Sequence, residues 1–315
     1  MTSKRDPRRE IWGYVPAAVS PFNPAGDLLI DRFAEVVRWH LDRGADGICV
    51  AGDNGEAWSL TADDRRRLAE TAVGVVGGRV HVTMGASATT ARQTIENAAI
   101  AAEGGVDSLM ITPQAYVMKA TPTEVLRRYK AINKAVPLPI LLYNSPRRTG
   151  GINVDIDLLG ALCDALPVIG LKESSRDFFH LSHVIRHFAE RISVLVGPGH
   201  YVIPGLALGA SGFLATGAEF LGDAVRRIQP LAAAKPCAEA RDLHHALTTV
   251  YQALMGTGTW PAALKAGLNM LGVPAGVPRE PVEPLRPRDS RKLQGVLEDL
   301  GLLPGGRKTG EAGGA

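Results

Sequence analysis

The stretch DRFAEVVRWHLDRGADGICVAG, residues 31–52, contains the structural unit that determines the fold. Apolar side chains in its first half recur at helical spacing and share one face: Phe33, Val36, Val37 and Leu41. Gly44 closes this half and is a residue type that commonly ends a helix. The second half, GICVAG, is a short apolar run typical of a buried strand. Residues 31–52 therefore predict a helix followed directly by a buried strand.

The same alternation of strand and helix repeats along the chain. The expected strands are eight short apolar runs, at 14–20, 47–52, 81–86, 108–112, 139–143, 168–172, 192–197 and 211–216. Segments of helical period lie between them, and those at 61–76 and 121–136 each begin with a threonine that can cap a helix. Eight repeats within residues 11–234 predict a (β/α)8 TIM barrel, which needs roughly 200–250 residues. A doubly wound sheet is the alternative, but it usually has fewer strands and a GxGxxG fingerprint after the first one, and no such fingerprint follows residues 14–20.

The chain extends beyond the expected barrel at both ends. Residues 235–303 contain further stretches of helical period and a proline-rich connector, which predict a C-terminal helical extension. Residues 1–10 are a charged leader and residues 304–315 are rich in glycine, so both are expected to be disordered. Residues 202–218 are the least charged stretch, but they are too short for a membrane helix and contain Pro204. We assign them to the barrel interior.

Composition restricts the classes of partner. Hydrophobic residues make up 45% of the 315 residues and charged residues 21%, as in a soluble globular protein, and the net charge is +3. Basic residues are scattered among acidic ones rather than gathered into a stripe, so no nucleic-acid partner and no membrane partner is expected. The charged leader has no apolar segment after it, which favours a cytoplasmic location over secretion. The three cysteines, Cys49, Cys163 and Cys237, fit no disulfide or zinc pattern.

One group of histidines has a spacing that could suit a metal. His180, His183 and His187 fall at positions that share a helix face. Their helix follows the sixth strand and belongs to the outer ring of the barrel, and no cysteine or carboxylate completes a convincing ligand set. We therefore expect no metal and no cofactor.

Functional side chains of such barrels stand at the C-terminal ends of the strands. Lys172 ends the sixth expected strand and Tyr143 ends the fifth, so the two are neighbours at the same mouth. A lysine among apolar walls loses hydration, its pKa falls, and its neutral amine can attack a carbonyl carbon to form a Schiff base. A nearby phenol can transfer the protons that this chemistry requires. The alternative is structural, with Lys172 paired to Glu173 and Tyr143 a satisfied core phenol.

Two loops at the same mouth are suited to binding carboxylates. GDNGE, residues 52–56, contains glycines that can leave backbone N–H groups open as a nest for an anion, although a plain turn has the same composition. PRRTG, residues 146–150, has two arginines, one of which could clamp a substrate carboxylate. A solvated arginine is the alternative there.

Three motifs resemble those of the dihydrodipicolinate synthase and N-acetylneuraminate lyase family of class I pyruvate-dependent aldolases, a DapA-like fold family. GDNGE is similar to that family's GTTGE, YNSPRRTG (143–150) matches YNxPxRTG, and GLKE (170–173) matches GxKE. The resemblance covers residues 11–300 and implies that Lys172 forms a Schiff base with pyruvate or another 2-oxo acid while Tyr143 transfers protons. It also implies a homotetramer. The further residues expected at the substrate are Asp53, Asn54, Gly55, Glu56, Arg148, Leu214 and Tyr116.

The sequence departs from members of this family in three places and keeps one residue that separates its branches. Asp53 stands where the synthase has a threonine of a hydroxyl relay, so it could tune Tyr143 or act as a base. Tyr116 is displaced, with two extra residues, from the tyrosine that the synthase supplies to a neighbouring subunit. Arg148 is retained where sialic acid lyases lack it, which favours a substrate with its own carboxylate. GPGH, residues 197–200, replaces the acidic pair of sugar-acid lyases, which disfavours a polyhydroxylated sugar acid.

These observations favour a Schiff-base lyase or synthase that condenses or cleaves pyruvate or a 2-oxo acid with an aldehyde, similar to 4-hydroxy-tetrahydrodipicolinate synthase. A 2-oxo-3-deoxy acid aldolase or dehydratase, or a cyclic imino acid deaminase, is the alternative within the family, with Asp53 taking over proton transfer. A non-catalytic carboxylate-binding barrel is the alternative from another class.

Overall fold

The structure is a computed structural model that describes residues 11–234 and 237–303. The expected disordered leader, 1–10, and tail, 304–315, lie outside the described residues. The last helix of the barrel, α8, spans Val225–Ala232, and the first helix of the C-terminal region, α9, spans Ala238–Gly256.

Eight parallel strands form one sheet within the described residues. They are β1 (Gly13–Tyr14), β2 (Gly47–Val50), β3 (His81–Gly85), β4 (Ser108–Ile111), β5 (Ile140–Asn144), β6 (Val168–Glu173), β7 (Ser193–Val196) and β8 (Gly212–Phe213). Each strand pairs with the next along the chain from β2 to β8, and β8 pairs with β1. A parallel bridge between Ala17 and Cys49 joins the chain after β1 to β2 and closes the ring. The predicted (β/α)8 TIM barrel is confirmed.

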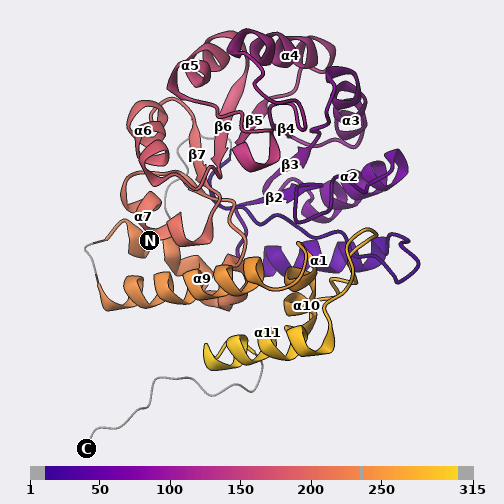
Figure 1. Ribbon diagram of the computed structural model, residues 1–315, viewed down its shortest axis with the longest axis vertical. Coiled ribbons are helices and arrows are strands. Elements are labelled where there is room, and N and C mark those ends of the chain that lie inside the picture. Colours follow the sequence, from indigo (N-terminus) through magenta and orange to yellow (C-terminus); the bar gives the residue numbers. More distant parts are fainter. Residues whose placement is uncertain (1–10, 235–236, 304–315) are drawn as a thin grey trace, which may run out of the picture.

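The barrel helices surround the strands (Figure 1). They are α1 (Ile30–Asp42), α2 (Ala62–Val76), α3 (Ala91–Glu103), α4 (Pro122–Ala135), α5 (Ile156–Ala165), α6 (Phe178–Phe188), α7 (Val202–Ala207) and α8, with 3₁₀ turns at Pro146–Arg148, Gly199–Tyr201 and Ala218–Ala224. Thr61 and Thr121 cap α2 and α4 through reciprocal bonds with Asp64 and Glu124, as their sequence positions predict. Gly44 has a φ of 77° just after α1, the left-handed conformation that favours glycine.

The structure corrects two details of the strand predictions. Residues 14–20 form a strand only as far as Tyr14, because Pro16 has no N–H to donate to a neighbouring strand. Residues 202–218 do not lie wholly inside the barrel, because their first six residues form α7 on its outside and only Gly212–Phe213 form a strand. Pro204 lies in the first turn of α7, where a missing backbone N–H is tolerated.

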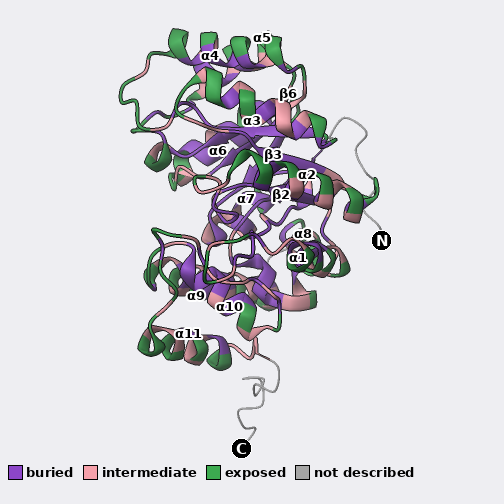
Figure 2. Ribbon diagram, turned by 90° about the vertical axis from the view of Figure 1, so that its right-hand side faces the viewer, coloured by how far each residue is buried: buried purple, intermediate pink, exposed green. Residues whose placement is uncertain are grey.

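The C-terminal region consists of α9, α10 (Ala262–Met270) and α11 (Pro287–Asp299). Figure 1 shows α9 running across the side of the barrel, with α10 and α11 beyond it. In Figure 2 most of the strand residues and the inner faces of the helices are buried, whereas the outer faces of α4, α5 and α11 are exposed. Helix α9 packs against α8 and against the 3₁₀ turn Gly199–Tyr201, so the C-terminal region reaches the end of the barrel that carries the loops after the strands.

No helix in the described ranges combines the length and the apolar character that crossing a membrane requires.

Candidate active site

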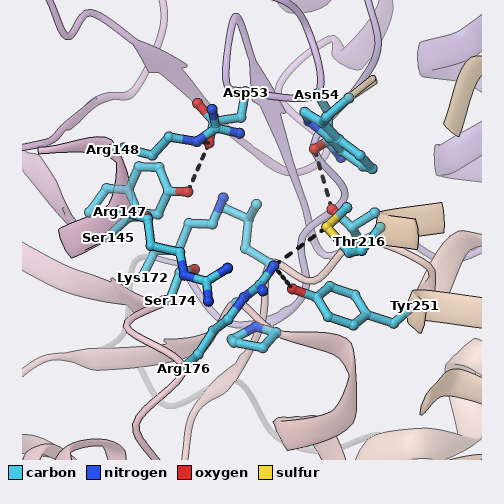
Figure 3. A pocket seen from close by; sticks show the side chains of 16 residues that line it. Asp53, Asn54, Ser145, Arg147, Arg148, Lys172, Ser174, Arg176, Thr216 and Tyr251 are labelled. Atoms are coloured by element: carbon cyan, nitrogen blue, oxygen red, sulfur yellow. Dashed lines mark hydrogen bonds and ion pairs between the residues drawn. The ribbon is translucent and has the colours of Figure 1, made fainter. Parts of the chain in front are cut away.

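Lys172 lies in a cavity of about 300 Å³ at the C-terminal end of the barrel (Figure 3). Tyr143 lines the same cavity. The register of β5 and β6 pairs the two residues directly, and Nζ of Lys172 lies 4.2 Å from the centroid of the Tyr143 ring. Each side chain is 7% exposed. The strand register therefore places the Lys172 amine next to the Tyr143 phenol, as their positions at the strand ends predict.

Glu173 points to the opposite face of β6 from Lys172, as the alternation of side chains along a strand requires. Its carboxylate accepts a hydrogen bond from Nδ2 of Asn144 at 2.7 Å and lies 3.3 Å from Nε2 of His180. No ion pair between Lys172 and a carboxylate occurs in the described part of the chain. The structural alternative, in which Lys172 pairs with Glu173, does not describe this molecule.

His180, one of the three regularly spaced histidines, is the partner of Glu173. Burial lowers the pKa of His180, but the hydrogen bond and charge of Glu173 outweigh this and raise it above its ordinary value. His183 and His187 lie with their ring centroids 6.1 Å apart. Within the residues that the structure describes, no three side chains of the metal-binding types are gathered at one point.

Lys172 is desolvated by an apolar barrel interior. The buried cluster below it contains Ile11, Val15, Cys49, Met110, Leu141, Leu195 and Leu214. Burial lowers the pKa of the Lys172 amine, with Arg148 adding to this effect and Cys49 and Asp53 opposing it. Burial also raises the pKa of the Cys49 thiol to about 11, so at neutral pH this group is not an anion that would stabilise the ammonium. The site therefore favours the neutral, nucleophilic amine more than water does.

Asp53 joins Tyr143 to Arg148. The Tyr143 hydroxyl donates a hydrogen bond to Oδ2 of Asp53 at 3.0 Å, and the same oxygen lies 3.1 Å from Nε of Arg148. Burial raises the pKa of Tyr143 well above its ordinary value, and the neighbouring Asp53 charge raises it further. The phenol is thus held protonated, with its proton directed to the Asp53 carboxylate.

The loop 52–56 offers open backbone donors beside this group. Ala51 and Glu56 have positive φ values of 51° and 55°, which fold the loop tightly at both ends. The amides of Asp53 and Asn54 have no backbone or side-chain acceptor in the part of the chain that the structure describes. The Asn54 side chain is fixed by bonds to the carbonyl of Ala17 and to the hydroxyl of Thr216, each at 3.3 Å. The arrangement has the open N–H groups of an anion nest.

The other predicted site residues divide into two groups. Asn54, Arg148 and Leu214 line the cavity together with Asp53, Tyr143 and Lys172. Three residues outside that lining are Gly55, Glu56 and Tyr116. The carbonyl of Gly55 accepts a hydrogen bond from Ser20, Glu56 is fully buried against Lys265 of α10, and Tyr116 is 88% exposed on the loop after β4.

A comparison with known protein families agrees with this site. The model of the dihydrodipicolinate synthetase family matches residues 10–300, which is most of the chain. The chain belongs to this family.

Relatives within the dihydrodipicolinate synthetase family differ in how far they are characterised. The chain is 30% identical over 281 residues to 4-hydroxy-tetrahydrodipicolinate synthase 1 of Halalkalibacterium halodurans, covering 89% of this chain and 94% of that protein. It is 32% identical over 302 residues to an uncharacterized DapA-like lyase of Pyrobaculum neutrophilum, covering 93% and 99%. Among solved structures it is similar to YagE of E. coli K12 in complex with pyruvate, with a TM-score of 0.86, 25% identity and coverage of 93% and 99%.

Residues from a distant part of this family member's chain, which the sequence motifs do not predict, also line the cavity. Tyr251 and Met255 come from α9, and Trp260 comes from the turn between α9 and α10. Arg176, from the loop after β6, also lines the cavity and was not predicted. Its position two residues beyond KES, at the end of the strand that carries Lys172, is a signal that could have identified it.

Proposed function

We propose that this protein is a class I aldolase or lyase that forms a Schiff base between Lys172 and pyruvate or another 2-oxo acid. The observation that carries the proposal is the desolvated Lys172 amine, 4.2 Å from the ring of a tyrosine whose hydroxyl is bonded to Asp53. The family supports it, because its named relatives include a 4-hydroxy-tetrahydrodipicolinate synthase and a protein in complex with pyruvate.

The proposed reaction divides among the residues of the cavity. The open amides of Asp53 and Asn54 hold the carboxylate of pyruvate, and the neutral Lys172 amine attacks its C2 carbonyl. Loss of water gives the imine, and removal of a proton from C3 gives the enamine. C3 then forms a bond to the carbonyl carbon of an aldehyde, whose oxygen takes up a proton. Water hydrolyses the imine, releases the product and restores Lys172, and the reverse sequence cleaves the same bond.

Tyr143 and Asp53 are the proposed proton carriers for these steps. The Tyr143 hydroxyl can give a proton to a departing or developing oxygen, and the Asp53 carboxylate can accept one from the substrate. A carboxylate in this relay also favours a second candidate within the family, a 2-oxo-3-deoxy acid aldolase or dehydratase or a cyclic imino acid deaminase. In those reactions Asp53 would remove or return the substrate proton.

Borohydride reduction tests the covalent step. Incubation with pyruvate and borohydride should add the mass of reduced pyruvate to the peptide that contains Lys172. Lys265 is a matched control within the chain, because it is also buried, its pKa is lowered to about 8, mainly by burial, and it lies outside the cavity. Absence of an adduct on Lys172 with every 2-oxo acid tried would contradict both enzyme candidates and favour the non-catalytic carboxylate-binding barrel.

A second assay separates the two enzyme candidates. Enzyme that forms the pyruvate adduct is mixed with pyruvate and aspartate semialdehyde, and consumption of the semialdehyde is followed. Consumption supports the synthase reaction. Adduct formation without consumption favours the aldolase, dehydratase or deaminase.

The proposal includes a homotetramer that works in the cytoplasm without a metal or cofactor. The loop after β4 supports self-association, because Tyr116, Val117 and Met118 are 88%, 44% and 70% exposed. Apolar side chains gathered on one exposed loop are typical of surfaces that another chain covers. Sedimentation measures the mass of the wild type and of Met118→Glu. If the wild type is a tetramer and Met118→Glu has the same mass, this loop is excluded from the interface.

A further inference from the structure

Glu56 makes buried ionic contacts that the proposed covalent chemistry does not use. Its side chain is fully buried, and its carboxylate pairs with the ammonium group of Lys265, which is 1% exposed. The second carboxylate oxygen accepts a hydrogen bond from the backbone N–H of Arg279 at 2.8 Å. Both partners belong to the C-terminal region, Lys265 in α10 and Arg279 in the segment between α10 and α11. Because burying two charges is costly, an apolar pair of similar size would stabilise this contact about as well.

The backbone of Glu56 closes the turn that contains the open amides. Its N–H donates to the carbonyl of Asp53 at 3.2 Å, and its φ of 55° lies in the left-handed region that favours glycine. A residue with a side chain stays in that region only when the surrounding contacts hold it there. The amides of Asp53 and Asn54, which form the anion nest, lie within this turn. Contacts that fix the Glu56 side chain therefore also fix the shape of the nest.

Lys265 holds the same loop by a second route. Its Nζ donates hydrogen bonds to the carbonyls of Ser20 and Val277, at 2.7 and 2.8 Å. The Ser20 hydroxyl donates in turn to the carbonyl of Gly55 at 2.8 Å. A Cβ on Gly55 would lie only 3.2 Å from that hydroxyl oxygen, so the two segments are in close contact. Lys265 thus reaches the loop both through the Glu56 carboxylate and through Ser20.

Arg279 links this contact to the start of α2. Its Nη1 donates hydrogen bonds to the carbonyl of Ser59 and to the carboxylate of Asp64, each at 2.7 Å. The ring of Phe22 contacts both cations, with its centroid 4.5 Å from Nζ of Lys265 and 4.0 Å from Cζ of Arg279. Cation–π contacts of this kind add to the hydrogen bonds that orient the two side chains. The partners of Glu56 are therefore themselves held in place.

We infer that Lys265 and Arg279 are positioning residues that act through Glu56 to hold the anion nest in the shape that binds a carboxylate. The C-terminal region thus takes part in substrate binding, although neither cation lines the cavity. The inference rests on the proposed function, because that proposal assigns the nest to the carboxylate of the 2-oxo acid. Lys265 and Arg279 touch no reacting atom and take no part in bond making or breaking.

Trapping of two matched ligands tests this role. The probes are pyruvate and pyruvamide, which present the same ketone to Lys172 but differ in the charge of the group that the nest binds. Trapping with cyanoborohydride gives the apparent second-order rate constant of adduct formation for each probe and the limiting rate at saturating pyruvate. In Lys265→Met the ratio of the two rate constants, pyruvate over pyruvamide, should fall about tenfold, as expected for weakened hydrogen bonds to a charged group. The limiting rate should change by about twofold at most, because the amine of Lys172 is untouched.

The double variant Glu56→Gln/Lys265→Met separates positioning from stability. It leaves no unpaired charge at this contact, so it should be more stable than Lys265→Met. It still lacks the ammonium group that holds the loop, so its pyruvate preference should stay as low as in Lys265→Met. Lys265→Arg keeps a cation at this position and should retain more of the preference than Lys265→Met does.

Arg128→Met is the matched control for the loss of a buried cation. Arg128 is 8% exposed and donates hydrogen bonds to the carbonyls of Ala88 and Thr89, outside the loop that forms the nest. Its loss should lower the unfolding free energy but leave the preference for pyruvate over pyruvamide at the wild-type value.

Three results would overturn the positioning role while Lys172 still forms its adduct. The first is a wild-type preference in Lys265→Met. The second is a preference that recovers together with stability in the double variant. The third is a preference that falls equally in Arg128→Met, or a limiting rate that falls as far as the preference does, because either shows a general structural loss.

Failure of the proposed function gives a different result. If the wild type forms no adduct with any 2-oxo acid, calorimetry with pyruvate measures the nest directly. An affinity that falls about tenfold in Lys265→Met but not in Arg128→Met then supports the positioning role without the covalent chemistry. An unchanged affinity in Lys265→Met, or no binding of pyruvate to the wild type, overturns it.

Discussion

The Tyr143 hydroxyl donates a hydrogen bond to Asp53 across the mouth of the barrel, with an oxygen–oxygen distance of 3.0 Å. The two residues are 90 positions apart and come from the loop after β2 and the end of β5. Because the phenol pKa is raised by burial and by Asp53, this bond keeps the proton on Tyr143 until a stronger base develops in the cavity. In the proposed reaction, the Asp53 carboxylate takes the place of a neutral hydroxyl with a group that can carry charge.

Replacing Asp53 with threonine should impair the enzyme's own reaction. The hydroxyl can accept the Tyr143 bond but cannot accept a proton as a carboxylate does, so kcat should fall by roughly 10²-fold or more. Steady-state assays on the best substrate found with the wild type measure this, and Thr216→Ser, which retains the hydroxyl bonded to Asn54, is the control. Unchanged kcat in Asp53→Thr would show that Asp53 is not a proton carrier.

The pH dependence of borohydride trapping should report the charges around Lys172. Trapping rises with pH as the ammonium loses its proton, and burial sets the midpoint below the ordinary lysine value. Arg148 lowers this pKa and Asp53 raises it. Arg148→Met should therefore move the midpoint to higher pH, and Asp53→Asn should move it to lower pH.

The control for this pH series is Arg186→Met on the outer face of α6, where removal of the same charge should leave the midpoint unchanged. Rates of adduct formation are measured by mass spectrometry at saturating pyruvate, so that weaker binding does not distort the profile. Shifts of the same sign in Arg148→Met and Asp53→Asn would contradict the opposite effects of these two charges on Lys172.

The barrel could be predicted from the sequence because each of its strands is an apolar run between helical segments, and burial inside a parallel sheet imposes that pattern locally. Lys172 and Tyr143 could be predicted for the same reason, since each lies at the end of such a run. The length of β1 could not be judged from apolar character alone, because Pro16 breaks the hydrogen-bond ladder without changing the hydrophobic pattern.

Residues that depend on contacts between distant segments could not be predicted. Tyr251 and Trp260 reach the cavity because α9 packs across the barrel, and no local pattern encodes that packing. Glu56 was expected beside the substrate because its loop is at the mouth, but its side chain points away to Lys265, more than 200 positions later. The position of the loop was predicted correctly. The direction of the Glu56 side chain is set by Lys265, which lies outside the GDNGE motif.

The buried Glu56–Lys265 pair should stabilise the fold only as a pair. Glu56 is fully buried, Lys265 is 1% exposed, and Lys265 also donates to the carbonyls of Ser20 and Val277. Lys265→Met leaves the Glu56 carboxylate without its charged partner, which should cost about 3–5 kcal/mol of unfolding free energy.

The double variant Glu56→Gln/Lys265→Met provides the control for this pair, because it removes both charges and should recover part of that stability. Urea unfolding at neutral pH is measured for the wild type, Lys265→Met, Glu56→Gln and the double variant. A loss in the double variant equal to the sum of the two single losses would contradict the coupling between these residues.

Glu219 should make the protein less stable as pH rises through neutrality. It lies 5% exposed after β8, and burial raises its pKa to about 7, although hydrogen bonds from its own amide and that of Gly217 oppose this. Between the unfolded value near 4.5 and about 7, the folded chain holds a proton that the unfolded chain has lost, so the stability from this group is present at low pH and is lost as pH rises.

Glu219→Gln keeps an acceptor for the Gly217 amide without a titrating group. At pH 8 the variant should be more stable than the wild type by on the order of 2–3 kcal/mol, and the difference should shrink toward pH 4.5. Urea midpoints measured at both pH values check this, and a difference that does not change with pH would show that Glu219 does not titrate in the folded protein.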